Sequence, residues 1–159
     1  MGRSFLASVE RYPNALAISD HDVRYTYSEW LDDILRVVTG FEKNKIKFGH
    51  HIITMLSNRY EAATIHIACQ LSGVIITPLN WRAPCEELDY VVKDSGAVAI
   101  IFESATEKTI VSSSEAKYLS KIAVETGHEI GTPWEQFKNC HPAPKSSNAY
   151  PDNTSVMLY

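Results

Sequence analysis

The chain has 159 residues, of which 45% are hydrophobic and 21% are charged, and its formal net charge is -4 at pH 7. This composition is typical of an ordinary globular protein that buries its own core without disulfides or metals. The mild negative charge argues against a nucleic-acid-binding surface, which shows a clustered basic excess, so we predict no nucleic-acid partner.

The cysteines and the apolar segments bear on where the protein works. Cys69, Cys85 and Cys140 are odd in number and widely spaced, so they predict no disulfide framework and favour a reducing, cytoplasmic setting. The longest apolar stretch, residues 62–79, is interrupted by polar residues, a glycine and a proline. A membrane span needs about 20 mostly apolar residues, so we predict no membrane span.

The start of the chain predicts an arm followed by a β-hairpin. Two short apolar runs, residues 15–19 and 23–25, flank the polar turn Asp20-His21-Asp22. Two such runs around a short polar turn are the usual hairpin pattern.

A long amphipathic helix is predicted next. Thr26 and Glu29 have the spacing of a capping box, which marks a helix start. Apolar residues then recur with helical spacing at Trp30, Leu31, Ile34, Leu35, Val37, Val38 and Phe41. The opposite, exposed face is predicted to carry Asp32, Asp33, Arg36 and Lys43.

The middle of the chain alternates between short apolar strands and helices. Buried strands are predicted at residues 52–56, 74–77 and 97–102, and helices at residues 60–71 and 84–96. Near-continuous apolar strands that alternate with helices are typical of a parallel sheet covered on both faces. The predicted fold class is therefore α/β, with a doubly wound, mostly parallel sheet flanked by helices.

After residue 103 the pattern weakens. Residues 115–125 predict a helix followed by a strand, and residues 133–139 predict a short helix. Residues 141–153 are rich in proline, serine and asparagine and predict a surface linker, and residues 156–159 predict a last strand.

The predicted elements divide the chain into three parts. Residues 1–25 form the N-terminal arm and hairpin, and residues 26–140 form the α/β sheet subdomain. Residues 141–159 are predicted to form a linker and a lead-in strand to a phosphate-binding loop that we expect to follow this chain.

Ligands of open α/β sheets bind beyond the carboxyl ends of the strands. In this chain those ends carry Asn58, Asn80 and Arg82. For each of the three, a role in loop structure is favoured over ligand binding.

The remaining polar candidates have structural explanations too. His50-His51 predicts a turn, because no further ligand is suitably spaced to complete a metal site. His66 and Cys69 lie on an apolar helix, and we predict that His66 is a core or interface residue and Cys69 a core residue. Glu86-Glu87 lies in a first helical turn, where carboxylates interact favourably with the helix dipole. We therefore assign no catalytic, cofactor-binding or metal-binding residue to this chain.

Several segments together resemble motifs of the adenylate-forming superfamily, which includes acyl-CoA synthetases, aryl-CoA ligases, luciferases and peptide-synthetase adenylation domains. Residues 26–30 resemble its T-Y-x-E-L motif, and residues 58–61 are similar to N-S-x-E. Residues 71–80 resemble L-K-A-G-A-x-x-x-P-L-N, and residues 82–96 resemble R-x-x-x-E-E-L followed by D-S-G. The P-L-N ending leans toward acyl- and aryl-CoA ligases.

The resemblance implies an enzyme that activates a carboxylic acid with ATP and Mg²⁺ to an acyl-adenylate and transfers the acyl group to CoA. The family's phosphate-binding loop, Y-T-S-G-T-T-G-x-P-K, would begin at Tyr159. We therefore expect this chain to be a truncated N-terminal portion of an acyl-CoA synthetase that is inactive and binds no cofactor by itself.

An alternative remains open from the sequence: a stand-alone, non-catalytic α/β module that acts in interaction or regulation. In the ligase interpretation the last strand lacks its cover. Because an uncovered edge strand offers unpaired backbone groups, self-association through this edge is also expected.

Overall fold

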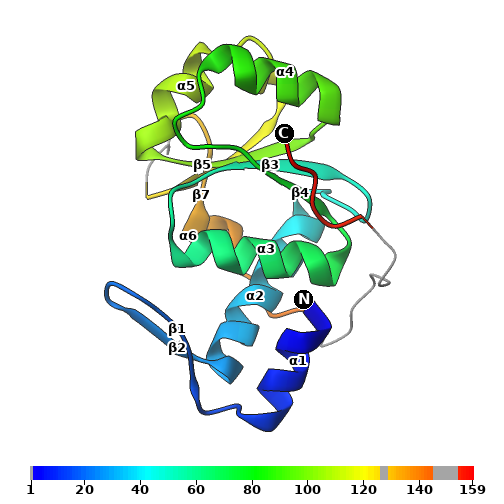
Figure 1. The fold of residues 1–159 in the computed structure, drawn as a ribbon, viewed down its shortest axis with the longest axis vertical. Helices are drawn as coiled ribbons and strands as arrows, with labels where there is room; N and C mark the ends of the chain where they lie inside the picture. Colours follow the sequence, from blue (N-terminus) through cyan, green and yellow to red (C-terminus); the bar gives the residue numbers. More distant parts are fainter. Residues whose placement is uncertain (1, 126–128, 145–153) are drawn as a thin grey trace.

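The computed structural model describes residues 2–125, 129–144 and 154–159 (Figure 1). The linker predicted for residues 141–153 therefore lies largely outside the described residues.

The elements follow one another in two groups. The first comprises α1 (Gly2–Arg11), β1 (Leu16–Asp20), β2 (Val23–Thr26), α2 (Tyr27–Lys43), β3 (His51–Met55), α3 (Tyr60–Ser72), β4 (Ile75–Pro78) and α4 (Cys85–Ser95). The second comprises β5 (Ala99–Glu103), η1 (Ser104–Thr106), α5 (Glu107–Ser112), η2 (Ala116–Tyr118), β6 (Ser120–Val124), β7 (Thr132–Pro133) and α6 (Trp134–Phe137).

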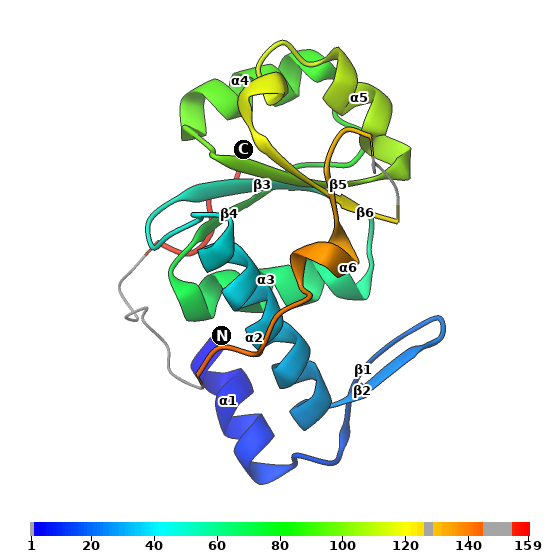
Figure 2. The ribbon, with the colours of Figure 1, turned by 180° about the vertical axis from the view of Figure 1, so that it is seen from behind.

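The main sheet has five strands in the order β4-β3-β5-β6-β7, and every neighbouring pair is parallel. The predicted last strand lies beside β4, where Val156 forms a parallel bridge with Ile76. β1 and β2 form the predicted hairpin, a separate antiparallel pair that projects from the body (Figures 1 and 2).

Helices cover both faces of the sheet, which confirms the doubly wound prediction (Figure 2). α2, α3 and α6 lie on one face, and α4 and α5 lie on the other. Side chains of the strands alternate between the two cores: Ile52 and Ile101 pack on the α2–α3 side, whereas Ile53 and Phe102 pack on the α4–α5 side. Both faces are therefore apolar, which explains the near-continuous apolar strands.

The capping box predicted at the start of α2 is present. The Glu29 amide donates to Thr26 Oγ1 at 3.3 Å, and the Thr26 amide donates to Glu29 Oε2 at 2.8 Å. The hydrogen bonds that the Thr26 amide and hydroxyl donate to the Glu29 carboxylate lower the pKa of Glu29 from its usual value. All seven apolar residues predicted for the inner face of this helix are buried.

One residue predicted on the exposed face of α2 is buried. Asp33 is only 9% exposed, because Lys138 at the end of α6 lies over it, with its Nζ 3.0 Å from Asp33 Oδ1. The partner is distant in sequence, so helical periodicity alone placed this residue on the wrong face.

Residues 115–125 contain the predicted helix and strand in the predicted order, but the helix is shorter than expected. The helix is limited to the single turn η2, and β6 follows directly. Asp89 on α4 accepts hydrogen bonds from Ser113 Oγ and from the Ser114 and Glu115 amides, and so holds this segment as a loop on α4.

Gly73 ends α3 in the left-handed region, with φ at +75°. A Cβ atom added there would lie 2.2 Å from a ring carbon of Phe48, so Gly73→Ala is expected to add a steric cost to the backbone cost of about 1–2 kcal/mol. Urea unfolding checks this result. The matched control is Gly49→Ala, which has φ at +78° and nothing within 4 Å of its Cβ position. Equal losses in the two variants would contradict the steric contribution of Phe48.

Candidate functional site

The strand order places a switch point between β3 and β5. From β3 the chain first adds β4 on one side of the sheet and then β5 on the other, so α3 and α4 cover opposite faces. Crevices of open α/β sheets form at the carboxyl ends of the strands at such a point. Here the flanking residues are Ser57 and Arg59 after β3 and Glu103 at the end of β5.

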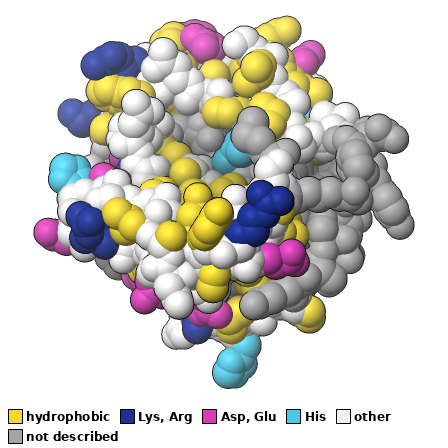
Figure 3. Space-filling model, turned by 60° about the horizontal axis from the view of Figure 1, so that its bottom comes forward, with side chains coloured by type: hydrophobic (Ala, Val, Ile, Leu, Met, Phe, Trp, Pro, Cys, Tyr) yellow, Lys and Arg dark blue, Asp and Glu magenta, His cyan; other side chains and the backbone are white. Residues whose placement is uncertain are grey.

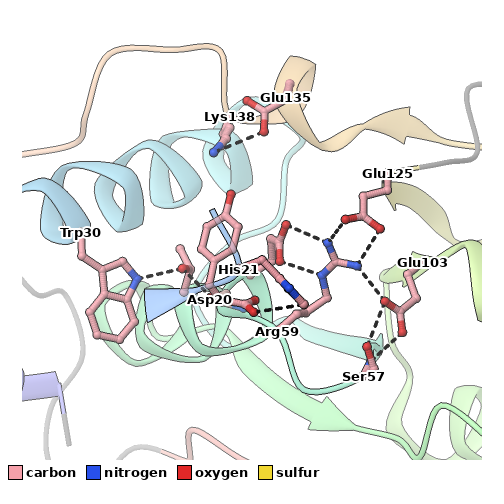
Figure 4. A network of polar contacts seen from close by, with 12 residues as sticks. Asp20, His21, Trp30, Ser57, Arg59, Glu103, Glu125, Glu135 and Lys138 are labelled. Carbon is pink, nitrogen blue, oxygen red and sulfur yellow. Dashed lines mark hydrogen bonds and ion pairs between the residues drawn. The ribbon is translucent and has the colours of Figure 1, made fainter. Parts of the chain in front are cut away.

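Glu103 connects the two strand ends. Glu103 is only 6% exposed. Its carboxylate accepts hydrogen bonds from the Ser57 amide at 2.7 Å, the Ser57 hydroxyl at 3.2 Å and Arg59 Nη1 at 2.7 Å (Figure 4). Thr106 adds a second link, because its hydroxyl donates to the Met55 carbonyl and accepts from the Glu103 amide. A polar network of the chain itself thus joins the strand ends at the switch point.

Arg59 is the centre of this network. Arg59 donates to the carboxylate of Glu61, on α3, through Nε at 2.6 Å and Nη2 at 3.0 Å. It also donates to the carboxylate of Glu125, which follows β6, through Nη2 at 2.6 Å and Nη1 at 3.1 Å. Burial disfavours the charged guanidinium, but hydrogen bonds to Glu61, Glu125 and Glu103 raise the pKa of Arg59 above its usual value. The same hydrogen bond lowers the pKa of Glu125.

The hairpin also reaches this edge. Asp20 at the end of β1 accepts from the Tyr60 amide at 2.9 Å and so satisfies a free N–H group in the first turn of α3. The hairpin tip, the β3–α3 turn and the ends of β5 and β6 line a cavity of about 510 Å³. The acidic residues that line it are Asp20, Asp22, Glu61, Glu103 and Glu125.

The charge of this cavity decides what it fits. Five carboxylates face one guanidinium, so a triphosphate is repelled. Within residues 2–125, 129–144 and 154–159, no group of three or more His, Cys, Asp or Glu residues is placed to hold a metal ion. The acidic lining of this cavity therefore does not suit a triphosphate.

The three residues predicted at the carboxyl ends of strands, Asn58, Asn80 and Arg82, lie at two different strand ends. Asn58 is exposed and lines the acidic cavity beside Arg59. Asn80 and Arg82 follow β4, on the other side of β3 from Glu103. Asn80 Oδ1 accepts from the Arg82 amide at 2.9 Å, and the Arg82 guanidinium stacks on Trp81 at 4.2 Å from the ring centroid. Asn80 therefore shapes its own loop.

The histidines and the buried cysteine lie apart from this edge. His50 lies in the turn before β3, where its Nδ1 accepts from the Lys47 amide, and His51 begins the strand. His66 is half-buried against Gln70, and burial lowers its pKa. Cys69 is fully buried, which raises the pKa of its thiol. Glu86 and Glu87 are exposed in the first turn of α4.

The interpretation of the sequence missed the network around Arg59. Arg59 and Glu61 were noted within a motif but given no role. The available signal was the position of Glu103 and Glu125, each of which directly ends an apolar strand run. Because these residues are far apart in sequence, only the parallel order of β3, β5 and β6 brings them together.

Among the described residues, no helix has the length and apolar character that crossing a membrane requires.

Two relatives indicate the kind of protein to which the chain is similar. It is 28% identical over 103 residues to "Putative acyl-CoA synthetase YngI" of Bacillus subtilis (strain 168), which covers 64% of this chain and 19% of the relative. It is 26% identical over 113 residues to a feruloyl-CoA synthase of Amycolatopsis sp., which covers 71% of this chain and 23% of the relative. The chain thus spans about a fifth of the length of these curated relatives.

Solved structures agree on the fold. A benzoate CoA ligase from Burkholderia xenovorans LB400 matches 99% of this chain and 32% of its own, with a TM-score of 0.89 at 16% identity. The family model described as AMP-binding enzyme matches residues 5–159. The chain therefore belongs to the AMP-binding enzyme family, and its fold is that of the N-terminal domain of adenylate-forming ligases.

Proposed function

We propose that this chain forms the first part of the N-terminal domain of an ATP-dependent, AMP-forming acid–CoA ligase. The observation that carries the proposal is the family match across residues 5–159. The names of the relatives, an acyl-CoA synthetase and a feruloyl-CoA synthase, support a carboxylic acid as substrate and CoA as acceptor. The family match favours this function over a stand-alone interaction module.

In the whole protein, the carboxylate of the acid would attack the α-phosphorus of ATP and release pyrophosphate. The CoA thiol would then displace AMP from the acyl carbon, with Mg²⁺ offsetting the phosphate charge. The proposed part of the described residues is to hold the strand ends on which the rest of the site is built.

Further features belong to the same proposal. We propose a reducing, cytoplasmic setting, which agrees with the three free cysteines. The division of the chain after residues 25 and 140 stays a prediction. Self-association through the strand beside β4 also stays a prediction, which light scattering behind size exclusion would check.

The reaction is tested by pyrophosphate exchange with the whole protein. We expect exchange of labelled pyrophosphate into ATP that depends on an added acid, over a panel of straight-chain fatty acids, benzoates and hydroxycinnamates. The control is the same mixture without acid. Absence of acid-dependent exchange across the panel would contradict the proposed function.

Residues 1–159 alone are expected not to bind ATP–Mg²⁺, because the cavity at their carboxyl edge is acidic. Calorimetric titration of the isolated chain measures this directly. A micromolar dissociation constant corresponds to about 8 kcal/mol of binding free energy and requires an organised site. Such a value would show that these residues hold the nucleotide without the rest of the protein.

A further inference from the structure

We propose that Arg59 is a positioning residue that locks the carboxyl ends of β3, β5 and β6 into one arrangement and does not itself bind substrate. Its role in the reaction rests on the proposed function, whereas the lock itself rests on the geometry of the described residues alone.

The donors of Arg59 are all used within the chain. A guanidinium has five N–H donors. Nε donates to Glu61, Nη1 to Glu103 and Glu125, and Nη2 to Glu61 and Glu125, at distances between 2.6 and 3.1 Å. No N–H group is left for a phosphate or a carboxylate ligand. An arginine at a ligand-binding edge would ordinarily suggest anion recognition, but this one is saturated.

The contacts join segments that are far apart in sequence. Glu61 belongs to α3, Glu103 ends β5 and Glu125 follows β6 (Figure 4). Glu103 carries the link on to Ser57 at the end of β3. The side chains of Arg59, Glu61 and Glu103 are 12%, 6% and 7% exposed. Water therefore competes little for the hydrogen bonds between them.

The backbone at Glu125 gives independent support. Its φ is +64°, a left-handed conformation that residues with a Cβ seldom adopt. Its two carboxylate oxygens both accept from Arg59. Such conformations persist where surrounding contacts fix them, and they cluster at functional sites. We infer that the ion pair holds the chain in this conformation where it leaves β6.

The lock is specific to arginine. Lysine keeps the positive charge but has three donors around a single nitrogen, so it cannot reach three carboxylates in the planar geometry of the guanidinium. Arg59→Lys therefore removes the arrangement and retains the charge. Because small displacements of positioning groups can cost about 10²-fold in rate, a loosened edge is expected to lower kcat.

Hydrogen exchange of the whole protein tests the lock without reference to activity. In Arg59→Lys, peptides that cover residues 55–61 and 103–107 are expected to exchange at least about tenfold faster. Peptides at the amino end of the sheet, around Gly49 and Ile75, are expected to keep wild-type rates. Uniform acceleration in all peptides, or none at residues 55–61, would overturn the lock.

Steady-state pyrophosphate exchange of the whole protein tests the role in the reaction. We expect Arg59→Lys to lose about 10²-fold in kcat, with a smaller change in KM for the acid. Glu125→Gln is expected to lose less, because its side chain is 65% exposed. Leu35→Ala, in the core under α2, controls for loss of stability and should retain wild-type kcat below its melting temperature.

The two proposals fail in different ways. If the wild-type protein shows no acid-dependent exchange, the ligase function fails, and hydrogen exchange still decides on the lock. If the wild-type protein is active and Arg59→Lys keeps wild-type kcat, Arg59 has no positioning role in the reaction.

Discussion

Lys138→Met is expected to destabilise the protein by about 3–5 kcal/mol, the usual cost of removing one partner of a buried ion pair. Lys138 is 8% exposed, and its Nζ lies 3.0 Å from Asp33 Oδ1. Asp33 Oδ2 is buried and has no hydrogen-bond partner among the described residues, so loss of the ammonium leaves this carboxylate uncompensated. Chemical denaturation at neutral pH measures the loss.

The stability that the Lys138–Asp33 ion pair contributes is expected to fall only at alkaline pH. Burial alone would lower the pKa of Lys138, but the charge and hydrogen bond of Asp33 raise it above the usual value of 10.5. A group whose pKa is raised on folding stabilises the folded state fully below its unfolded pKa. The contribution is therefore complete at neutral pH and declines only in alkaline solution above that value.

Two further variants separate the ion pair from its surroundings. Glu135→Gln changes an exposed second contact of Lys138 and should alter stability by less than about 0.5 kcal/mol. Combining Lys138→Met with Asp33→Leu removes both charges and should recover most of the loss. A double variant as unstable as Lys138→Met would show that packing, and not the unpaired carboxylate, causes the effect.

Leu35→Ala is expected to destabilise the protein by about 2–5 kcal/mol. Leu35 lies on the inner face of α2 and is 3% exposed, so truncation removes buried apolar area and leaves a cavity. Urea unfolding of the variant and of wild type gives the difference. Leu16→Ala, at a residue that is 52% exposed, is the matched surface control. A loss below about 0.5 kcal/mol for Leu35→Ala would be that of a surface position.

Local signals predicted most of the first hundred residues. The capping box at Thr26 and Glu29, the apolar spacing of α2 and the glycine that ends α3 act within a few residues of chain. Each apolar strand run was long enough to identify β3, β4 and β5, and their alternation with helices predicted the parallel sheet. The family motifs lie in this same part of the chain.

The features that the sequence did not predict depend on distant partners. Asp33 fits the polar face of α2, but Lys138 covers it from the far end of the chain. The segment before β6 resembles a helix, but its start is held by Asp89 on α4 through the Ser114 and Glu115 amides. Arg59 meets Glu103 and Glu125 only because β5 lies beside β3, and β6 beside β5, all in the same direction. Strand order decides such contacts, and no local pattern encodes it.

The position of Val156 has a consequence for how the protein folds. Its bridge partner, Ile76, lies on the edge of the sheet opposite β7, so the chain completes one edge and then returns to the other (Figure 1). Contacts between residues so distant in sequence form slowly, because the intervening chain must first be ordered. During synthesis from the N-terminus, the outer edge of β4 therefore stays unpaired until residues 154–159 emerge. This interval is when the nascent protein is most exposed to pairing with a neighbouring chain.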